Sequence, residues 1–290
     1  MKKVIQISIL ISILLGFSVV GYWILGTKEA AKSAIQSIPG EPSLIVRVND
    51  YKKLWTSLKE TNLMWQELEN IEGFHDWQNQ IVWLDSLLKE SPEIFEAVNN
   101  QPFYLSLYQQ EKSERLLLTA QIENQSAWPK LRTWFLEKFK DDIQSTDVPK
   151  ALQIATNKGN TIHVLFDQGI LSLSNSIELI NAIQATSDSM TYSTKSPQFL
   201  KLHKTADEHV NANVYVNFSK FNYHIQRQLN ASFANDFDKF TNYGNWSVLD
   251  VSLKPNKLTL SGLTGTSKQN SYLALFQKQK PQALNLDRIL

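Results

Sequence analysis

Histidines are the first side chains to consider for catalysis or metal binding, and their spacing in this chain favours neither. His203 and His209 are six residues apart rather than four, so they do not share one face of a helix, and no H-E-x-x-H motif occurs. His163 alternates with apolar residues, as a histidine within a strand does. The chain has no cysteine, so a structural zinc site of the usual kind is not expected. We predict that the protein is not an enzyme and has no metal site and no cofactor.

Two acidic groups could hold a calcium ion or act as a paired acid and base. They are Asp141 and Asp142 with Asp147, and Asp236 with Asp238. Neither group continues into the D-x-[DN]-x-[DN]-G-x5-E pattern that builds a calcium-binding loop. We interpret both groups as solvated charges in turns.

The glycine-rich stretch Gly262–Lys268 is the segment nearest in type to a phosphate-binding loop. It follows a predicted strand and precedes a predicted helix, whose first amides could bind an anion. The G-x-x-x-x-G-K-[ST] pattern of such loops is missing, however. Thr266 or Ser267 as the N-cap of that helix is a sufficient explanation. We therefore assign no phosphate site.

Tryptophans are the remaining candidates for a binding surface. The chain has eight, and Trp55, Trp65, Trp77 and Trp83 all fall in one predicted helical block, residues 50–100. Trp77 belongs to an apolar stripe of helical period and is expected in the core, whereas Trp83 lies outside that stripe. We predict that Trp65 and Trp83 contact a partner, in a groove or on an exposed surface, and packing in the core is the alternative.

The apolar segment Val4–Leu25 determines the expected location. It carries no charge, and about 22 residues at roughly 1.5 Å each cover the roughly 30 Å core of a bilayer. Lys2 and Lys3 precede it, which keeps the N-terminus cytoplasmic, and Tyr22 and Trp23 suit the far membrane interface. We predict an uncleaved, single-pass signal anchor in the bacterial cell membrane, with the bulk of the chain in the periplasm. A cleaved signal peptide is the alternative.

Charge and composition narrow the classes of partner. The formal net charge is +1 and the charges are scattered, so no basic surface attracts nucleic acid. A chain of 290 residues without cysteine fits a bacterial envelope protein better than a eukaryotic ectodomain. The predicted partners are the lipid bilayer, through the N-terminal segment, and an envelope protein.

The expected elements repeat along the chain. Strand, helices, hairpin and helix occur in this order twice, and Val46–Asp50 in the first copy parallels Val214–Phe218 in the second. We predict an α+β fold in which an N-terminal transmembrane helix precedes a mainly antiparallel sheet of about nine strands, with helices packed on one face and a duplicated unit. The expected divisions are 1–25 for the anchor, 26–42 for a linker, 43–140 for the first unit, 141–210 for central strands and helices, 211–280 for the second unit, and 281–290 for a tail or the start of a further region.

Some segments resemble a known family. The apolar N-terminal segment, Ile38–Ser43 (IPGEPS), Val46–Asp50 (VRVND) with Leu54 and Trp55, and Leu171–Ser176 (LSLSNS) together resemble an uncharacterised bacterial envelope family, a domain of unknown function with an N-terminal membrane anchor. The resemblance implies no catalytic residues.

We therefore predict a membrane-anchored extracytoplasmic protein that acts as a non-catalytic binding module for a protein or another envelope component. A structural spacer or assembly scaffold is the alternative, and a hydrolase-type enzyme is the third. A pocket that joins His163 or His203 to a carboxylate would favour the enzyme. An exposed apolar patch near Trp65 or Trp83 would favour the binding module.

Overall fold

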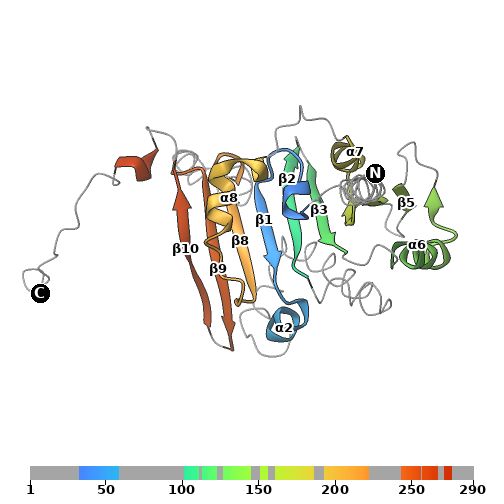
Figure 1. Ribbon diagram of the computed structural model, residues 1–290, viewed down its shortest axis with the longest axis horizontal. Coiled ribbons are helices and arrows are strands. Elements are labelled where there is room, and N and C mark those ends of the chain that lie inside the picture. Colours follow the sequence, from blue (N-terminus) through green and yellow to red (C-terminus); the bar gives the residue numbers. More distant parts are fainter. Residues whose placement is uncertain are drawn as a thin grey trace, which may run out of the picture.

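Ten strands form one antiparallel sheet in the computed structural model (Figure 1). The structure describes residues 33–58, 101–110, 113–122, 127–144, 151–155, 161–185, 193–221, 243–255, 257–266 and 271–275. The strands are β1 (Leu44–Val48), β2 (Phe103–Gln110), β3 (Ser113–Gln121), β4 (Ile143–Gln144), β5 (Ala151–Ala155), β6 (Thr161–Asp167), β7 (Ile170–Ser174), β8 (Ala212–Asn217), β9 (Trp246–Lys254) and β10 (Lys257–Gly265). Most are rich in Val, Ile, Leu and aromatic residues, which fit a pleated, half-buried surface.

The strand order is β10-β9-β8-β1-β2-β3-β7-β6-β5-β4. β1 and β8 are far apart in the sequence but pair directly, with Leu44 opposite Val216 and Val48 opposite Ala212. β2 and β3 follow on one side of this pair, and β9 and β10 follow on the other. Among the described strands, β10 and β4 are therefore the two edges of the sheet.

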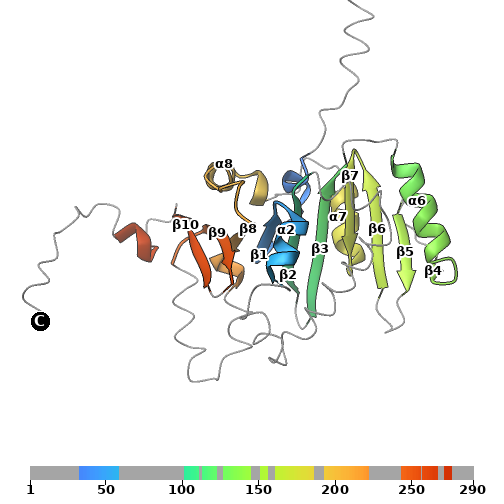
Figure 2. The same cartoon turned by 90° about the horizontal axis from the view of Figure 1, so that it is seen from below.

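The helices that the structure describes have between three and twelve residues. They are the 3-10 helices η1 (Ile35–Ser37), η3 (Ser193–Lys195) and η5 (Tyr272–Leu275), and the α-helices α2 (Tyr51–Thr56), α6 (Ala127–Lys138), α7 (Ile177–Gln184) and α8 (Pro197–His203). A polar N-cap begins α2, α7 and α8, because the side chains of Asp50, Ser176 and Ser196 each accept a backbone N–H of the first turn. Figure 2 shows α8 over the end of the sheet that holds β9 and β10.

Helices cover both faces of the sheet. Tyr51 of α2 and Phe135 of α6 belong to a hydrophobic cluster on one face, and Ile180 of α7 belongs to a cluster on the other. Val164 and Leu165 are neighbours in β6 but lie in different clusters, because successive side chains of a strand point to opposite faces. The sheet is thus the middle layer between two cores.

The predicted fold class is wrong. The sheet has ten strands rather than about nine, and helices pack on both of its faces rather than one. Within the residues expected to form a helix after the second hairpin, the described part is the four-residue 3-10 helix η5 (Tyr272–Leu275). The physical reason for the covered faces is that the inner strands carry apolar side chains on both faces, as Val164 and Leu165 of β6 do, and both sets are buried only if each face is covered.

The predicted N-terminal membrane helix, Val4–Leu25, lies outside the described residues. Each helix that the structure does describe is too short or too polar to cross a bilayer. The fold class defined by the described part of the chain is an antiparallel sheet with short helices on both faces.

Part of the segment expected as a linker, residues 26–42, contributes to the core. Ile35 and Ile38 are 3% and 0% exposed and pack in the same cluster as α7 and α8. Tyr108 Oη of β2 donates a hydrogen bond to the carbonyl oxygen of Pro39 at 2.8 Å. The described chain before β1 is therefore packed on the sheet.

Candidate functional site

Arg47 is a buried cation in β1. The alternation of β1 places it on the same face as Ile45, and its side chain is only 7% exposed. Arg47 Nη2 donates to Oε1 of Glu208 at 2.9 Å, although the Glu208 side chain is 71% exposed. The hydrogen bond and charge of Arg47 lower the pKa of Glu208, so this carboxylate is ionised. A buried guanidinium is thus paired with a carboxylate that reaches in from solvent.

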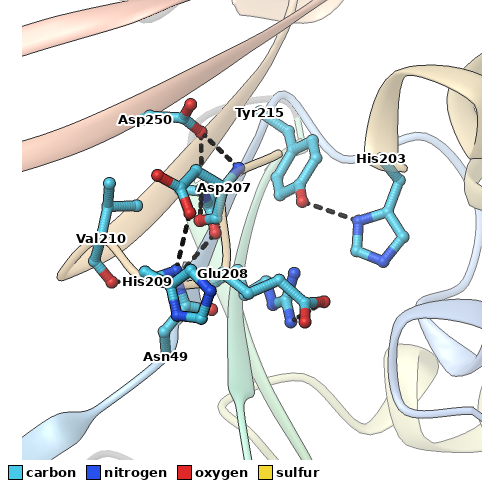
Figure 3. Close-up of polar contacts among 10 residues, drawn as sticks. Asn49, His203, Asp207, Glu208, His209, Val210, Tyr215 and Asp250 are labelled. Carbon is cyan, nitrogen blue, oxygen red and sulfur yellow. Dashed lines mark hydrogen bonds and ion pairs between the residues drawn. The ribbon is translucent and has the colours of Figure 1, made fainter. Parts of the chain in front are cut away.

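His203 and Tyr215 form a second polar pair on the same face (Figure 3). Tyr215 Oη of β8 lies 2.7 Å from Nδ1 of His203, the last residue of α8, and Phe199 stacks on the imidazole. Burial, with a smaller effect of Arg47, lowers the pKa of His203 to about 4, and burial raises the pKa of Tyr215. Both groups are therefore neutral near pH 7, and the imidazole tautomer sets which of the two donates the hydrogen bond.

Three polar side chains hold the loop that follows α8, and we call Asn49, Asn213 and Asp250 the polar clamp. Asn213 Nδ2 donates to the carbonyl oxygen of Asp207 at 2.9 Å and to Asp250 Oδ1 at 2.8 Å. The backbone N–H of Asp207 donates to the same Asp250 oxygen at 3.1 Å. Asn49 Nδ2 donates to the carbonyl oxygen of Val210 at 3.2 Å. The clamp therefore fixes the backbone on both sides of residue 208 (Figure 3).

The group of Arg47, Glu208, His203 and Tyr215 suits anion binding better than catalysis. A general acid or base works best when its pKa lies near the operating pH, whereas the pKa of His203 is about 4. The structure does bring His203 near a carboxylate, that of Glu208, but Glu208 bonds to Arg47 and His203 bonds to Tyr215. Within the described ranges, no three His, Asp or Glu side chains come together as a metal site would require.

The second candidate surface is the β10 edge, which we define as the outer side of strand β10. Among the described strands, β10 pairs only with β9. Its apolar side chains Leu258, Leu260 and Leu263 are 40%, 53% and 55% exposed. Tyr272 and Leu275 of η5 are also exposed, at 54% and 64%. Exposed apolar side chains on an edge strand are candidates for an interaction site.

The residues predicted from the sequence to contact a partner or the membrane all lie outside the described residues. They are Trp65 and Trp83 for the partner, Val4 and Leu25 at the ends of the membrane span, and Lys2, Lys3, Tyr22 and Trp23 at its interfaces. These predictions stay predictions.

The other sequence candidates are found apart from one another. His163 is buried in β6, where its low exposure of 7% agrees with a strand histidine. Of the two histidines compared for a shared helical face, His203 ends α8, and His209 lies in the loop beyond it. Gly262 and Gly265 belong to β10 itself, so the phosphate-loop interpretation is excluded by strand pairing rather than by motif alone.

Sequence reasoning missed Arg47, Glu208 and Tyr215. Arg47 did carry a signal, because it interrupts the strand SLIVRV at a position in phase with Ile45, and charged residues are almost never buried unless they are paired. Glu208 carried no such signal. It is 161 residues away from Arg47, and only the pairing of β1 with β8 brings the two together.

Comparisons with known proteins identify no family. No protein-family model matches the chain, and the curated proteins contain no match. One solved structure, titled "Structure of crystal form IV of TP0453", aligns with 11% identity and a TM-score of 0.37, over 79% of this chain and 78% of that chain. A similarity this low supports no conclusion about fold or function.

Proposed function

We propose that the protein is a non-catalytic binding module of the cell envelope that binds an extended segment of a partner protein along the β10 edge. The supporting observation is the composition of β10, KLTLSGLTG, which places one charge and no proline on a nine-residue edge strand. Edge strands usually carry charges, prolines or bulges that prevent further pairing. A strand without them is suited to accept another strand, and the backbone hydrogen bonds supply affinity.

The exposed leucines give this edge selectivity. Leu258 and Leu260 point to one face of the sheet and Leu263 points to the other, because side chains alternate along the strand. An added strand would contact apolar side chains on both faces. Selection of alternate side chains in this way is how strand-adding domains distinguish their partners.

Site-specific photocrosslinking tests this proposal. A photoreactive residue at Ser261, exposed at the centre of β10, should form an adduct with a second polypeptide in intact cells. Leu260→Lys should reduce the adduct at least about tenfold, because a lysine on the edge opposes strand addition. Gln144→Lys, on the opposite edge strand β4, is the matched control and should leave the adduct unchanged. An adduct that survives Leu260→Lys, or no adduct at all, would contradict the proposal.

The envelope location and the contact with the lipid bilayer depend on the sequence of the first 25 residues alone and stay predictions. Fractionation of cells that produce the full chain tests them. The intact polypeptide should sediment with membranes, and recovery in the cytosolic fraction would remove both the location and the envelope partner.

A further inference from the structure

We propose that Arg47 anchors a binding site for the carboxylate of a ligand, and that the side chain of Glu208 occupies this site in the absence of the ligand. The site lies on β1 and in the loop after α8 and does not involve the β10 edge. The two proposals can therefore succeed or fail separately.

The guanidinium of Arg47 is only partly used. Nη2 bonds to one oxygen of Glu208 and the Arg47 side chain also hydrogen-bonds to Tyr215, whereas Nε is buried without a hydrogen-bond partner among the described residues. A guanidinium binds a carboxylate best through two parallel N–H bonds. A buried donor that lacks a partner costs about 1–3 kcal/mol. The carboxylate of a ligand is not tethered to the loop, so it can bond to both Nε and Nη2. Glu208 bonds to Nη2 and leaves Nε without a partner.

Glu208 can leave without unfolding the loop. The polar clamp holds the backbone at Asp207 and Val210 through hydrogen bonds that do not involve the Glu208 side chain. The backbone N–H of His209 also donates to Asp207 Oδ1 at 2.9 Å. Rotation of one exposed side chain is therefore sufficient to open the site. The ion pair is not what holds this loop in place.

Arg47 then requires another anion. Its side chain is 7% exposed, and an unpaired buried charge is strongly unfavourable. The nearby Tyr215 and His203 are both neutral and cannot supply the missing negative charge. A carboxylate is the favoured ligand class, because the site already accommodates one. The carboxylate of the ligand replaces that of Glu208, so Arg47 stays paired with an anion while Glu208 moves into solvent.

Removal of the internal carboxylate tests the site. The full-length Glu208→Gln chain should bind acetate about fivefold more tightly than the unaltered chain, measured as the rise of Tm with acetate concentration against chloride at equal ionic strength. The matched control is Glu178→Gln, which breaks a second Arg–Glu pair, Arg115 with Glu178, at 3.2 Å. This control should show the acetate response of the unaltered chain. Equal responses of the Glu208→Gln and Glu178→Gln chains would overturn the proposal.

Two further arms define the ligand. Arg47→Gln should abolish the acetate response, and a full response in a folded Arg47→Gln chain would overturn the proposal. If that variant does not fold, the comparison of Glu208→Gln with Glu178→Gln decides alone.

N-acetyl-dialanine and its C-terminal amide distinguish the sources of a carboxylate. Tighter binding of the peptide acid than of acetate indicates a peptide C-terminus, and equal binding indicates a small organic acid. Binding of the amide as tight as that of the acid would overturn the proposal.

Discussion

Tyr215 Oη lies 2.7 Å from Nδ1 of His203, and this hydrogen bond joins the central strand β8 to the end of helix α8. Phe199, one turn earlier in α8, packs on both rings, with centroids 6.2 Å from His203 and 5.4 Å from Tyr215. The contact secures the helix that precedes the loop of Glu208. It links the packing of α8 to the geometry of the candidate carboxylate site.

Acidification should destabilise the protein through His203. Its pKa is about 4 in the folded chain, against an ordinary value of 6.5. Between these pH values the unfolded chain binds more protons than the folded chain, so the free energy of unfolding falls as pH decreases from about 6.5 to about 4. The loss should be roughly 2 kcal/mol, reduced for solvent screening because the side chain is only partly buried.

Urea unfolding at several pH values measures this effect. His203→Phe keeps a ring against Phe199 and removes the titrating group, so its stability should depend less on pH over this window. An unchanged slope in the His203→Phe chain would assign the pH dependence to other groups.

The His203–Tyr215 hydrogen bond should contribute measurably to stability. Tyr215→Phe removes the hydroxyl and leaves Nδ1 of His203 without its hydrogen-bond partner, at a cost of about 1–2 kcal/mol. In a double-mutant cycle with His203→Phe, the coupling energy should be about 1 kcal/mol. Urea unfolding of the four chains measures it. Additive losses would show that the two side chains act independently.

Gly262 should be intolerant of any side chain. A Cβ at this position would lie 1.8 Å from the carbonyl oxygen of Val248 in β9, so Gly262→Ala must force β9 and β10 apart. We expect a loss of about 1–3 kcal/mol and faster amide exchange in β10. Gly40→Ala is the control: its φ of +59° disfavours a side chain, but no atom lies within 4 Å of the added Cβ. Gly40→Ala should leave exchange in β10 unchanged, and slow exchange in Gly262→Ala would refute the steric argument.

The N-caps of α7 and α8 should contribute independently to the free energy of unfolding. Ser176 Oγ accepts the backbone N–H of Leu179 in α7 at 3.4 Å, and Ser196 Oγ accepts that of Phe199 in α8 at 3.2 Å. Replacement of either serine by alanine should cost about 1 kcal/mol. Urea unfolding of the single and double variants checks this. Because the caps belong to different helices, the two losses should add, and a marked departure from additivity would indicate that α7 and α8 depend on each other.

Several elements followed from local sequence. Alternation over Thr161–Phe166 and Ile170–Ser174 and the serine at 176 indicate two strands and a helix cap, because alternation and capping involve residues close together in the chain, and the structure contains these elements. The cover on both faces was not recognised. In β7 the pattern ILSLS reads as half polar, yet Ser172 and Ser174 are both buried. Ser174 Oγ donates to the Leu116 carbonyl oxygen at 2.7 Å in the neighbouring strand, whereas Ser172 Oγ has no hydrogen-bond partner among the described residues. A hydroxyl satisfied across strands cannot be distinguished from a solvated one by sequence alone.

The sequence by itself determined where most strands and helices of the described chain begin and end, because period-two alternation, turn residues and N-caps are local. Only the tertiary structure decided the strand order and the candidate site. Arg47 and Glu208 are 161 residues apart in the sequence and meet because β8 pairs with β1. That pairing depends on backbone hydrogen bonds between segments more than 160 residues apart. Local patterns specify that a strand forms, but any exposed edge of similar composition could pair with it. The packing of the whole sheet therefore decides which strands become neighbours.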